Sequence, residues 1–254
     1  MFAIHRSKTL GWSLALASLI VFSTALLCRA DDASISGVGG AVEMIGQHPT
    51  IRMVEERVSI TNPKFPHVTA SFVFHNDGRA TTVLIGFPER AYGAGADKQG
   101  AGLANFQSLV DGKPIRVTER PDSGNVADSG DYEGWLVKKV HFGAHQTHVI
   151  TDTYDGGGGE EAMGSQFFVY VLKSGASWKG PIGRAVISAD LSSLAGYSPL
   201  LIEPAGYKIV GHKVIWDLRN FKPKDDIEVT WFPAFLDVDV NGQYPYSGMD
   251  HRVR

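Results

Sequence analysis

The stretch that decides the fold is Val68-Thr69-Ala70-Ser71-Phe72-Val73-Phe74-His75-Asn76-Asp77-Gly78. Its even-numbered residues up to Phe74 are apolar, and the residues between them are Thr69, Ser71 and Val73. Such alternation is typical of a half-buried β-strand. The Asn-Asp-Gly end favours a tight turn, because asparagine and glycine tolerate positive φ. We therefore predict a hairpin in which residues 82–85 return as the partner strand. That strand should end at residues 87–88, since proline cannot donate a ladder hydrogen bond.

The same alternation recurs along the chain at short, regular spacing. The further strands are predicted at residues 106–110, 115–118, 135–142, 147–154, 184–191, 214–218, 227–232 and 236–240. Residues 167–172 are predicted to form a buried strand, because they are rich in aromatic and branched residues. Asp111-Gly112 and a turn around Gly143 predict two further hairpins. Helical periodicity is weak, with single turns predicted at residues 101–105 and 192–196. The sequence therefore predicts an all-β protein with an antiparallel, immunoglobulin-like β-sandwich, either one elongated sandwich or two small ones.

The N-terminal segment carries the pattern of a secretory signal peptide. A short basic start at residues 5–8 precedes an apolar run over residues 10–27. Cys28 and Ala30 supply the small side chains that signal peptidase requires before the cut. The alternatives are an uncleaved anchor helix, because the run approaches spanning length, and a lipid anchor on Cys28, which the large Leu27 disfavours. We expect cleavage, a secreted or periplasmic location in the cell envelope, and no membrane insertion of the mature chain.

Three loops interrupt the strand pattern, at residues 92–102, 121–134 and 155–164. The last contains four consecutive glycines and suits either a domain boundary or a hairpin tip. The predicted organisation is a signal peptide over residues 1–30, a β-sandwich domain over residues 31–154, and residues 155–254 as a second β-rich domain or a continuation of the first.

Charge and cysteine content exclude several classes of function. The formal net charge is −3, and loss of the three basic residues of the signal takes it to about −6. The chain has no basic stripe, so we expect no nucleic-acid partner. Cys28 is the only cysteine and leaves with the signal, so the mature chain has no disulfide and no thiolate metal site. Neither Lys-Ser nor Lys-Thr follows the glycine run, so it is not a phosphate loop, and no cofactor is expected.

Three neighbouring histidines are the candidate metal ligands. His141, His145 and His148 lie within eight residues, and imidazole is a common metal ligand. His141 and His148 lie on opposite arms of a predicted hairpin and could face one another. With Asp152 as the nearby carboxylate, the set is incomplete for zinc, and a polar hairpin end is the alternative interpretation.

Other candidate groups point to weaker possibilities. Acidic loop residues could bind calcium, although their spacing does not match an EF-hand; they are Asp122, Asp128, Asp131 and Glu133, with Glu160-Glu161 as a second set. A serine nucleophile at Ser177 is disfavoured, because Lys179 stands where a nucleophile elbow needs glycine. Two carboxylates could pair for glycoside cleavage, with Glu55, Glu56, Glu89 and Asp152 as candidates. Aromatic side chains near loops could form a sugar platform or lie buried, namely Trp178, Tyr197 and Tyr207.

Five segments along the chain form a recognisable order, namely residues 53–60, 72–76, 86–89, 135–138 and 170–183. Together they resemble a family of exported bacterial proteins with a domain of unknown function, and the resemblance spans residues 40–195. It implies a β-sandwich-like fold and brings no catalytic residues. In some similar proteins a stretch like Val238-Asp239-Val240-Asn241-Gly242 leads into a copper-amine-oxidase-like envelope domain, so this chain would be a minimal member. In the shared turn, Trp178 should cover the end of the core while Gly180 and Gly183 allow close backbone approach.

Two functions follow as expectations. The first is an exported, non-catalytic module that binds an envelope protein, a wall component or a glycan, because no catalytic motif is assembled. The loop at residues 92–102 and the tyrosines at strand ends are its candidate contacts. The alternative is a secreted hydrolase with a site built from loops, assisted by a metal on His141, His145 and His148.

Overall fold

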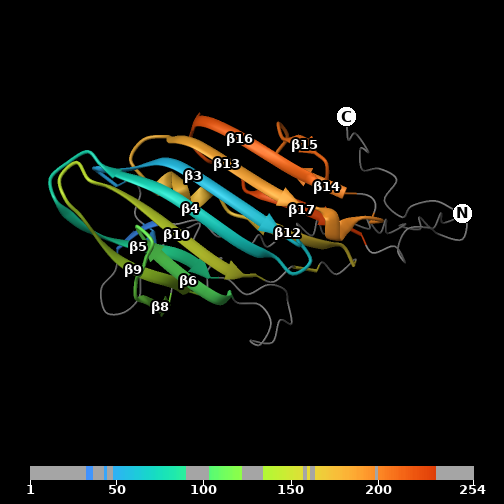
Figure 1. Ribbon diagram of the computed structural model, residues 1–254, viewed down its shortest axis with the longest axis horizontal. Coiled ribbons are helices and arrows are strands. Elements are labelled where there is room, and N and C mark those ends of the chain that lie inside the picture. Colours follow the sequence, from blue (N-terminus) through green and yellow to red (C-terminus); the bar gives the residue numbers. More distant parts are fainter. Residues whose placement is uncertain are drawn as a thin grey trace, which may run out of the picture.

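The protein is described by a computed structural model at residues 33–36, 43–44, 48–89, 103–121, 134–156, 159–160, 164–197 and 200–232. Its elements in chain order are β1 (Ala33–Ser36), β2 (Glu43–Met44), β3 (Ile51–Thr61), β4 (His67–Asn76), β5 (Thr81–Glu89), β6 (Ala104–Val110), β7 (Lys113–Pro114), β8 (Val117–Pro121), β9 (Gly134–Phe142), β10 (Thr147–Asp155), β11 (Gly159–Glu160), β12 (Gln166–Tyr170), the 3-10 helix η1 (Lys173–Ser177), β13 (Ile182–Asp190), the 3-10 helix η2 (Ser192–Leu194), β14 (Leu200–Glu203), β15 (Lys208–Val210), β16 (Lys213–Phe221) and β17 (Ile227–Trp231). The all-β prediction is therefore confirmed (Figure 1).

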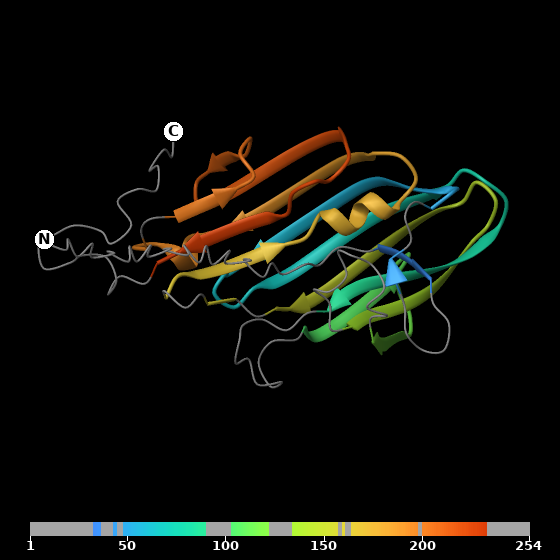
Figure 2. The ribbon, with the colours of Figure 1, turned by 180° about the vertical axis from the view of Figure 1, so that it is seen from behind.

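Three sheets pack in two layers. One layer is an eight-stranded sheet in the order β15-β16-β13-β3-β4-β10-β6-β7. A five-stranded sheet, β2-β1-β5-β9-β8, and a four-stranded sheet, β11-β12-β17-β14, cover one of its faces, as the view from behind shows (Figure 2). This arrangement is a sandwich with a divided second layer, and the apolar faces of all the longer strands meet between the layers.

Every described strand pairing is antiparallel except one. Residues 184–190 of β13 run parallel to residues 55–61 of β3, whereas β3 pairs with β4 in the antiparallel sense. The eight-stranded sheet therefore contains segments from before and after the glycine run at residues 156–159.

Two predicted hairpins are wrong in the same way. β4 pairs with β3 and β10, and β5 pairs with β1 and β9, so the turn after Asn76 carries the chain from one layer to the other. The turn after β9 carries it back to β10. The physical reason is that a two-layer fold can use a tight turn to change layers as well as to reverse direction. The predicted turn at Asp111-Gly112 is confirmed by the pairing of β6 with β7. The predicted partner strand at residues 115–118 is wrong in part, because residues 117–118 belong to β8 and pair with β9 in the five-stranded sheet.

Asn76 holds the two layer crossings together. Its side-chain Nδ2 donates to the carbonyl oxygens of Arg79 and Gly143 at 2.8 and 2.9 Å. Its Oδ1 accepts the N–H of Gly78 at 3.0 Å. The first and third of these contacts fix the crossing from β4 to β5, and the second reaches the neighbouring crossing from β9 to β10. Asn76 is 0% exposed, so each bond is made out of water.

Other strand boundaries show where local signals were insufficient. β5 continues through Pro88, which pairs with Trp135 of β9, while β1 pairs with β5 at residues 84–86. Proline is tolerated there because the described part of β1 pairs with β5 only as far as Gly86. Residues 104–105 belong to β6, so the predicted helical turn at residues 101–105 is wrong for that part. The turn at residues 192–196 is confirmed in η2, and the predicted strand at residues 236–240 lies outside the described residues.

The predicted structural turn around Trp178 is confirmed for Trp178 and Gly183, whereas no neighbouring atom of the described residues closely approaches Gly180, where glycine is favoured by its positive φ. Trp178 is 1% exposed, and its ring centroid lies 4.5 Å from that of Phe74. Gly180 has a φ of +71°. A Cβ on Gly183 would lie 2.4 Å from the carbonyl oxygen of Val54, so only glycine lets these two backbones approach so closely.

The structure also bears on membrane insertion. No helix in the described part of the chain combines the length and apolar character needed to span a bilayer.

Candidate functional site

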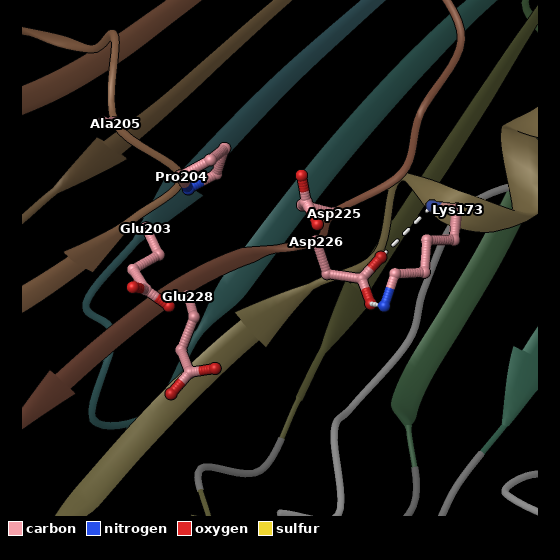
Figure 3. Close-up of a pocket in the computed structure, with 7 residues that line it drawn as sticks. All are labelled: Lys173, Glu203, Pro204, Ala205, Asp225, Asp226 and Glu228. Atoms are coloured by element: carbon pink, nitrogen blue, oxygen red, sulfur yellow. Dashed lines mark hydrogen bonds and ion pairs between the residues drawn. The ribbon is translucent and has the colours of Figure 1, made fainter.

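An acidic pocket lies where the four-stranded sheet meets the start of η1. Its volume is about 360 Å³, and its walls come from η1, the end of β14, the loop that follows β14, and the beginning of β17. The lining residues are Lys173, Glu203, Pro204, Ala205, Asp225, Asp226 and Glu228, which Figure 3 shows as sticks. Carboxylates therefore outnumber cationic side chains four to one among the lining residues.

Asp226 organises one wall of this pocket. Its Oδ1 accepts the backbone N–H groups of Leu172 and Lys173 at 3.2 and 3.1 Å. These amides begin η1 and have no partner within the helix. Its Oδ2 lies 3.3 Å from the Nζ of Lys173 (Figure 3). Asp226 is 8% exposed, so its charge is largely used to fix η1 and the lysine.

Glu203 and Glu228 form the opposite wall. They are directly paired residues on β14 and β17, and Figure 3 shows their side chains beside one another. Glu228 Oε1 accepts the hydroxyl of Thr230 at 2.8 Å. Like charges at directly paired positions destabilise a sheet, so a positive group placed between these two carboxylates would be favourable.

The loop after Glu203 completes the wall. The Glu203–Pro204 peptide bond is cis, and the carbonyl oxygen of Pro204 accepts the indole N–H of Trp216 at 2.8 Å. Trp216 is 0% exposed. The pocket wall is thereby attached to the core of the eight-stranded sheet, so the site sits on rigid elements.

A second unusual group, Glu56, is created by an irregularity in β3. Pairing with β4 shifts register between Met53 and Glu55, which makes Val54 the extra residue of a β-bulge. Met53 and Glu56 consequently both face inward, three residues apart, and are 1% and 0% exposed. The hydroxyl of Tyr170 donates to Glu56 Oε1 at 2.9 Å. Burial raises the pKa of Glu56 to about 8, and the bond from Tyr170 only partly opposes this.

The structure does not gather the three predicted histidine ligands around one point. His141 is exposed on β9, where its Nδ1 contacts Thr82 Oγ1 at 3.1 Å. His145 lies in the turn with a φ of 54°. His148 contacts Asp111 Oδ2 through Nδ1 at 2.6 Å and the carbonyl oxygen of His141 through Nε2 at 3.0 Å. Both of its ring nitrogens are therefore engaged.

No group of three or more His, Cys, Asp or Glu in the described segments could hold a metal ion. Metal binding by His141, His145 and His148 stays a prediction, which metal analysis of the purified protein would test.

The remaining predicted site residues are buried, half-buried or outside the described part of the chain. Ser177 is 1% exposed within η1. Tyr197 accepts a hydrogen bond from Lys64 Nζ at 2.8 Å, and Tyr207 packs edge-on against Trp216 with 5.6 Å between ring centroids. The candidate calcium ligands at residues 122–133, residue 161 and the loop at residues 92–102 lie outside the described residues.

Sequence reasoning missed the acidic pocket, and it named Glu56 only as one of several carboxylates. Glu203 and Glu228 are 25 residues apart in sequence, and nothing local indicates that β14 and β17 pair. Glu56 did carry a signal. It stands two and four residues before the apolar Val58 and Ile60, and period-two counting from them places it on the buried face.

Comparison with known proteins supports the fold. No protein-family model and no curated protein sequence matches this chain. Among solved structures, the chain is similar to a "putative nutrient binding protein" from Legionella pneumophila, with a TM-score of 0.65 and 24% identity over 87% of this chain and 78% of that one. This likeness shows a shared β-rich fold. The copper-amine-oxidase link implied by the sequence resemblance is not supported by any comparison, and residues 238–242 lie outside the described part.

A second solved structure is only distantly similar. An M1 zinc metallopeptidase from Deinococcus radiodurans aligns with a TM-score of 0.37 and 7% identity, over 72% of this chain and 42% of the peptidase. The chain thus spans less than half the length of that enzyme.

Proposed function

We propose that this chain is an exported, non-catalytic binding module of the cell envelope and that the acidic pocket takes an ammonium group of its ligand. Such a group is carried by the amino terminus or a lysine of a protein, by a peptide of the cell wall, or by an amino sugar of a glycan. The observation that carries the proposal is the direct pairing of Glu203 with Glu228 in a pocket of about 360 Å³, a volume within the range of small-molecule sites.

Two further observations support a binding role. Lys173 is engaged with Asp226, so the cation that lines the pocket is directed to the wall opposite Glu203 and Glu228. The solved structure that shares the fold is described as a "putative nutrient binding protein", and this description is consistent with a binding role without specifying the ligand.

The test compares charged and uncharged forms of one ligand. We would titrate the protein with short lysine-containing peptides and with the same peptides fully acetylated, following backbone amide signals by NMR. The free peptides should shift signals from β14, β17 and η1, and the acetylated peptides should not. Glu203→Gln combined with Glu228→Gln should weaken binding about tenfold or more, since each lost charge-assisted contact is worth about 1.5–3 kcal/mol.

A matched control and a second readout sharpen this test. Glu119→Gln removes one carboxylate from an exposed position on β8, in a different sheet, and should leave binding unchanged. Glu203→Gln alone should raise the free energy of unfolding by about 0.2–1 kcal/mol, because it removes a like-charge cross-strand pair. Equal binding of free and acetylated peptides, or full binding by the double variant, would contradict the proposal.

A further inference from the structure

A lysine and an aspartate meet in the interior between the two layers. Lys138 lies on β9 of the five-stranded sheet, and Asp152 lies on β10 of the eight-stranded sheet. Lys138 Nζ donates to Asp152 Oδ2 across the interface, and both side chains are 0% exposed. The pair therefore joins the layers at a point that solvent does not reach.

The residues around Asp152 are small or aromatic, so they leave space for the Lys138 side chain and surround the pair with apolar groups. On the strands that flank β10, the residues directly opposite Asp152 are Ala70 and Ser108, and both are small. The ring centroid of Phe106 lies 5.9 Å from the lysine Nζ, and this ring packs against Phe87 with 5.1 Å between centroids. The amine and the carboxyl group are thus held together among aromatic rings.

The second carboxylate oxygen of Asp152 has no hydrogen bond from the described residues to compensate for its burial. Asp152 Oδ1 and the hydroxyl of Ser108 are buried without a hydrogen-bond partner in the described part of the molecule. A buried ion pair repays its desolvation only when further hydrogen bonds satisfy its other atoms. The ion pair of Lys138 and Asp152 therefore leaves one carboxylate oxygen without a hydrogen bond from the described residues. A reaction that joined the two groups into a neutral amide would remove both buried charges.

We propose that Lys138 and Asp152 condense to an intramolecular amide, an isopeptide bond between β9 and β10. Proton transfer within the pair gives the neutral amine and the neutral carboxylic acid, which are the forms that react. The lysine Nζ then attacks Cγ, a proton from Nζ moves to Oδ2, and the Cγ–Oδ2 bond breaks. One water leaves, Oδ1 becomes the amide carbonyl oxygen, and no oxidant or other reactant is needed.

Two physical factors favour this reaction here. Fixing the two groups in contact replaces an encounter in solution, and effective molarities of well-oriented groups reach about 10⁵–10⁸ M. A site closed to water also favours condensation over hydrolysis. The bond would join the two layers covalently. The described residues include no cysteine, so no disulfide among them could do the same.

Mass spectrometry of the denatured full-length protein tests the proposal, because the covalent bond survives unfolding. We would compare wild type with Lys138→Arg, which retains the buried charge but supplies a guanidinium in place of the amine. Lys139→Arg is the matched control, since Lys139 is the exposed neighbour on the same strand. The Lys138 variant should exceed wild type by the Lys-to-Arg difference plus one water, and the Lys139 variant by the Lys-to-Arg difference alone.

Tryptic mapping gives an independent reading. In wild type the peptide that ends at Lys139 should remain joined to the peptide that begins at Val140, and fragmentation should place the link between Lys138 and Asp152. Equal mass differences for the two variants, together with separate peptides, would overturn the proposal. Neither result depends on the acidic pocket or its ligand, so the two proposals fail separately.

Discussion

Glu56 has an environment in the folded protein that is very different from the water around it in the unfolded chain. It is fully buried, it faces the core because of the bulge at Val54, and its recorded hydrogen bond comes from the Tyr170 hydroxyl. Burial raises its pKa from 4.5 to about 8. At neutral pH the folded protein therefore holds a proton on Glu56 that the unfolded chain releases.

This difference predicts how stability changes with pH. Below pH 4.5 Glu56 is protonated in both states, so its contribution to stability is complete. Between pH 4.5 and about 8 the unfolded state loses the proton first, so the free energy of unfolding should fall as pH rises. Glu56→Gln can still accept the Tyr170 hydrogen bond and does not titrate. It should therefore flatten the decline in urea midpoint from pH 5 to pH 8.

His48 also contributes to the pH dependence of stability, in both wild type and Glu56→Gln. Burial lowers the pKa of His48 from 6.5, so His48 favours folding less as pH falls below 6.5, which is the opposite slope. This effect is present in both proteins and cancels in their difference. Glu119→Gln, at an exposed position, should keep the wild-type profile. Parallel profiles for wild type and Glu56→Gln would show that Glu56 is not the titrating group.

At the scale of elements, the two layer crossings behave as one structural unit. Asn76 makes three hydrogen bonds to backbone groups of both turns, and the backbone N–H of Asn76 also donates to the carbonyl oxygen of Gln146 at 2.9 Å. The geometry of β5 and β10 at this end of the sandwich therefore depends on one buried amide.

Asn76→Ala should destabilise the protein strongly. The substitution leaves backbone groups of both turns without their partner, and each such buried group costs about 1–3 kcal/mol. We expect a loss of about 2–4 kcal/mol in the free energy of unfolding, measured by urea denaturation. Ser59→Ala, at an exposed position of the neighbouring β3, should change it by less than about 0.5 kcal/mol. A loss for Asn76→Ala as small as the control would show that water replaces these bonds.

Most strands could be predicted from the sequence, but their partners could not. The alternation of residues 68–74 follows from burial of one face, which is a local property. Whether the turn at Asn76 returns to the same sheet depends on what the next strand packs against, which no local pattern records. The parallel pairing of β3 with β13 joins residues about 130 apart, and the pocket depends on the antiparallel pairing of β14 with β17, which brings Glu203 opposite Glu228. Site residues were missed for this reason, whereas the turn at Trp178 was predicted from its own composition.

At the scale of the molecule, the question is whether the segments before and after the glycine run fold together. β3 lies between β4, which precedes the run, and β13, which follows it. Trp178 packs on Phe74, and Tyr170 bonds to Glu56, so residues from both sides share one core. Separating the segments would expose the edge of β3 and uncover the face that carries Glu56.

We therefore expect the protein to unfold in one cooperative transition, with equal calorimetric and van't Hoff enthalpies. A fragment of residues 31–154 should lack a cooperative transition, because β3 would lose β13 and the four-stranded sheet that covers its inner face. Near-ultraviolet circular dichroism provides a second reading, since the buried aromatic residues need fixed packing to give a signal. Two resolved transitions in the whole chain, with the first reproduced by the isolated fragment, would instead establish two independent sandwiches joined at the glycine run.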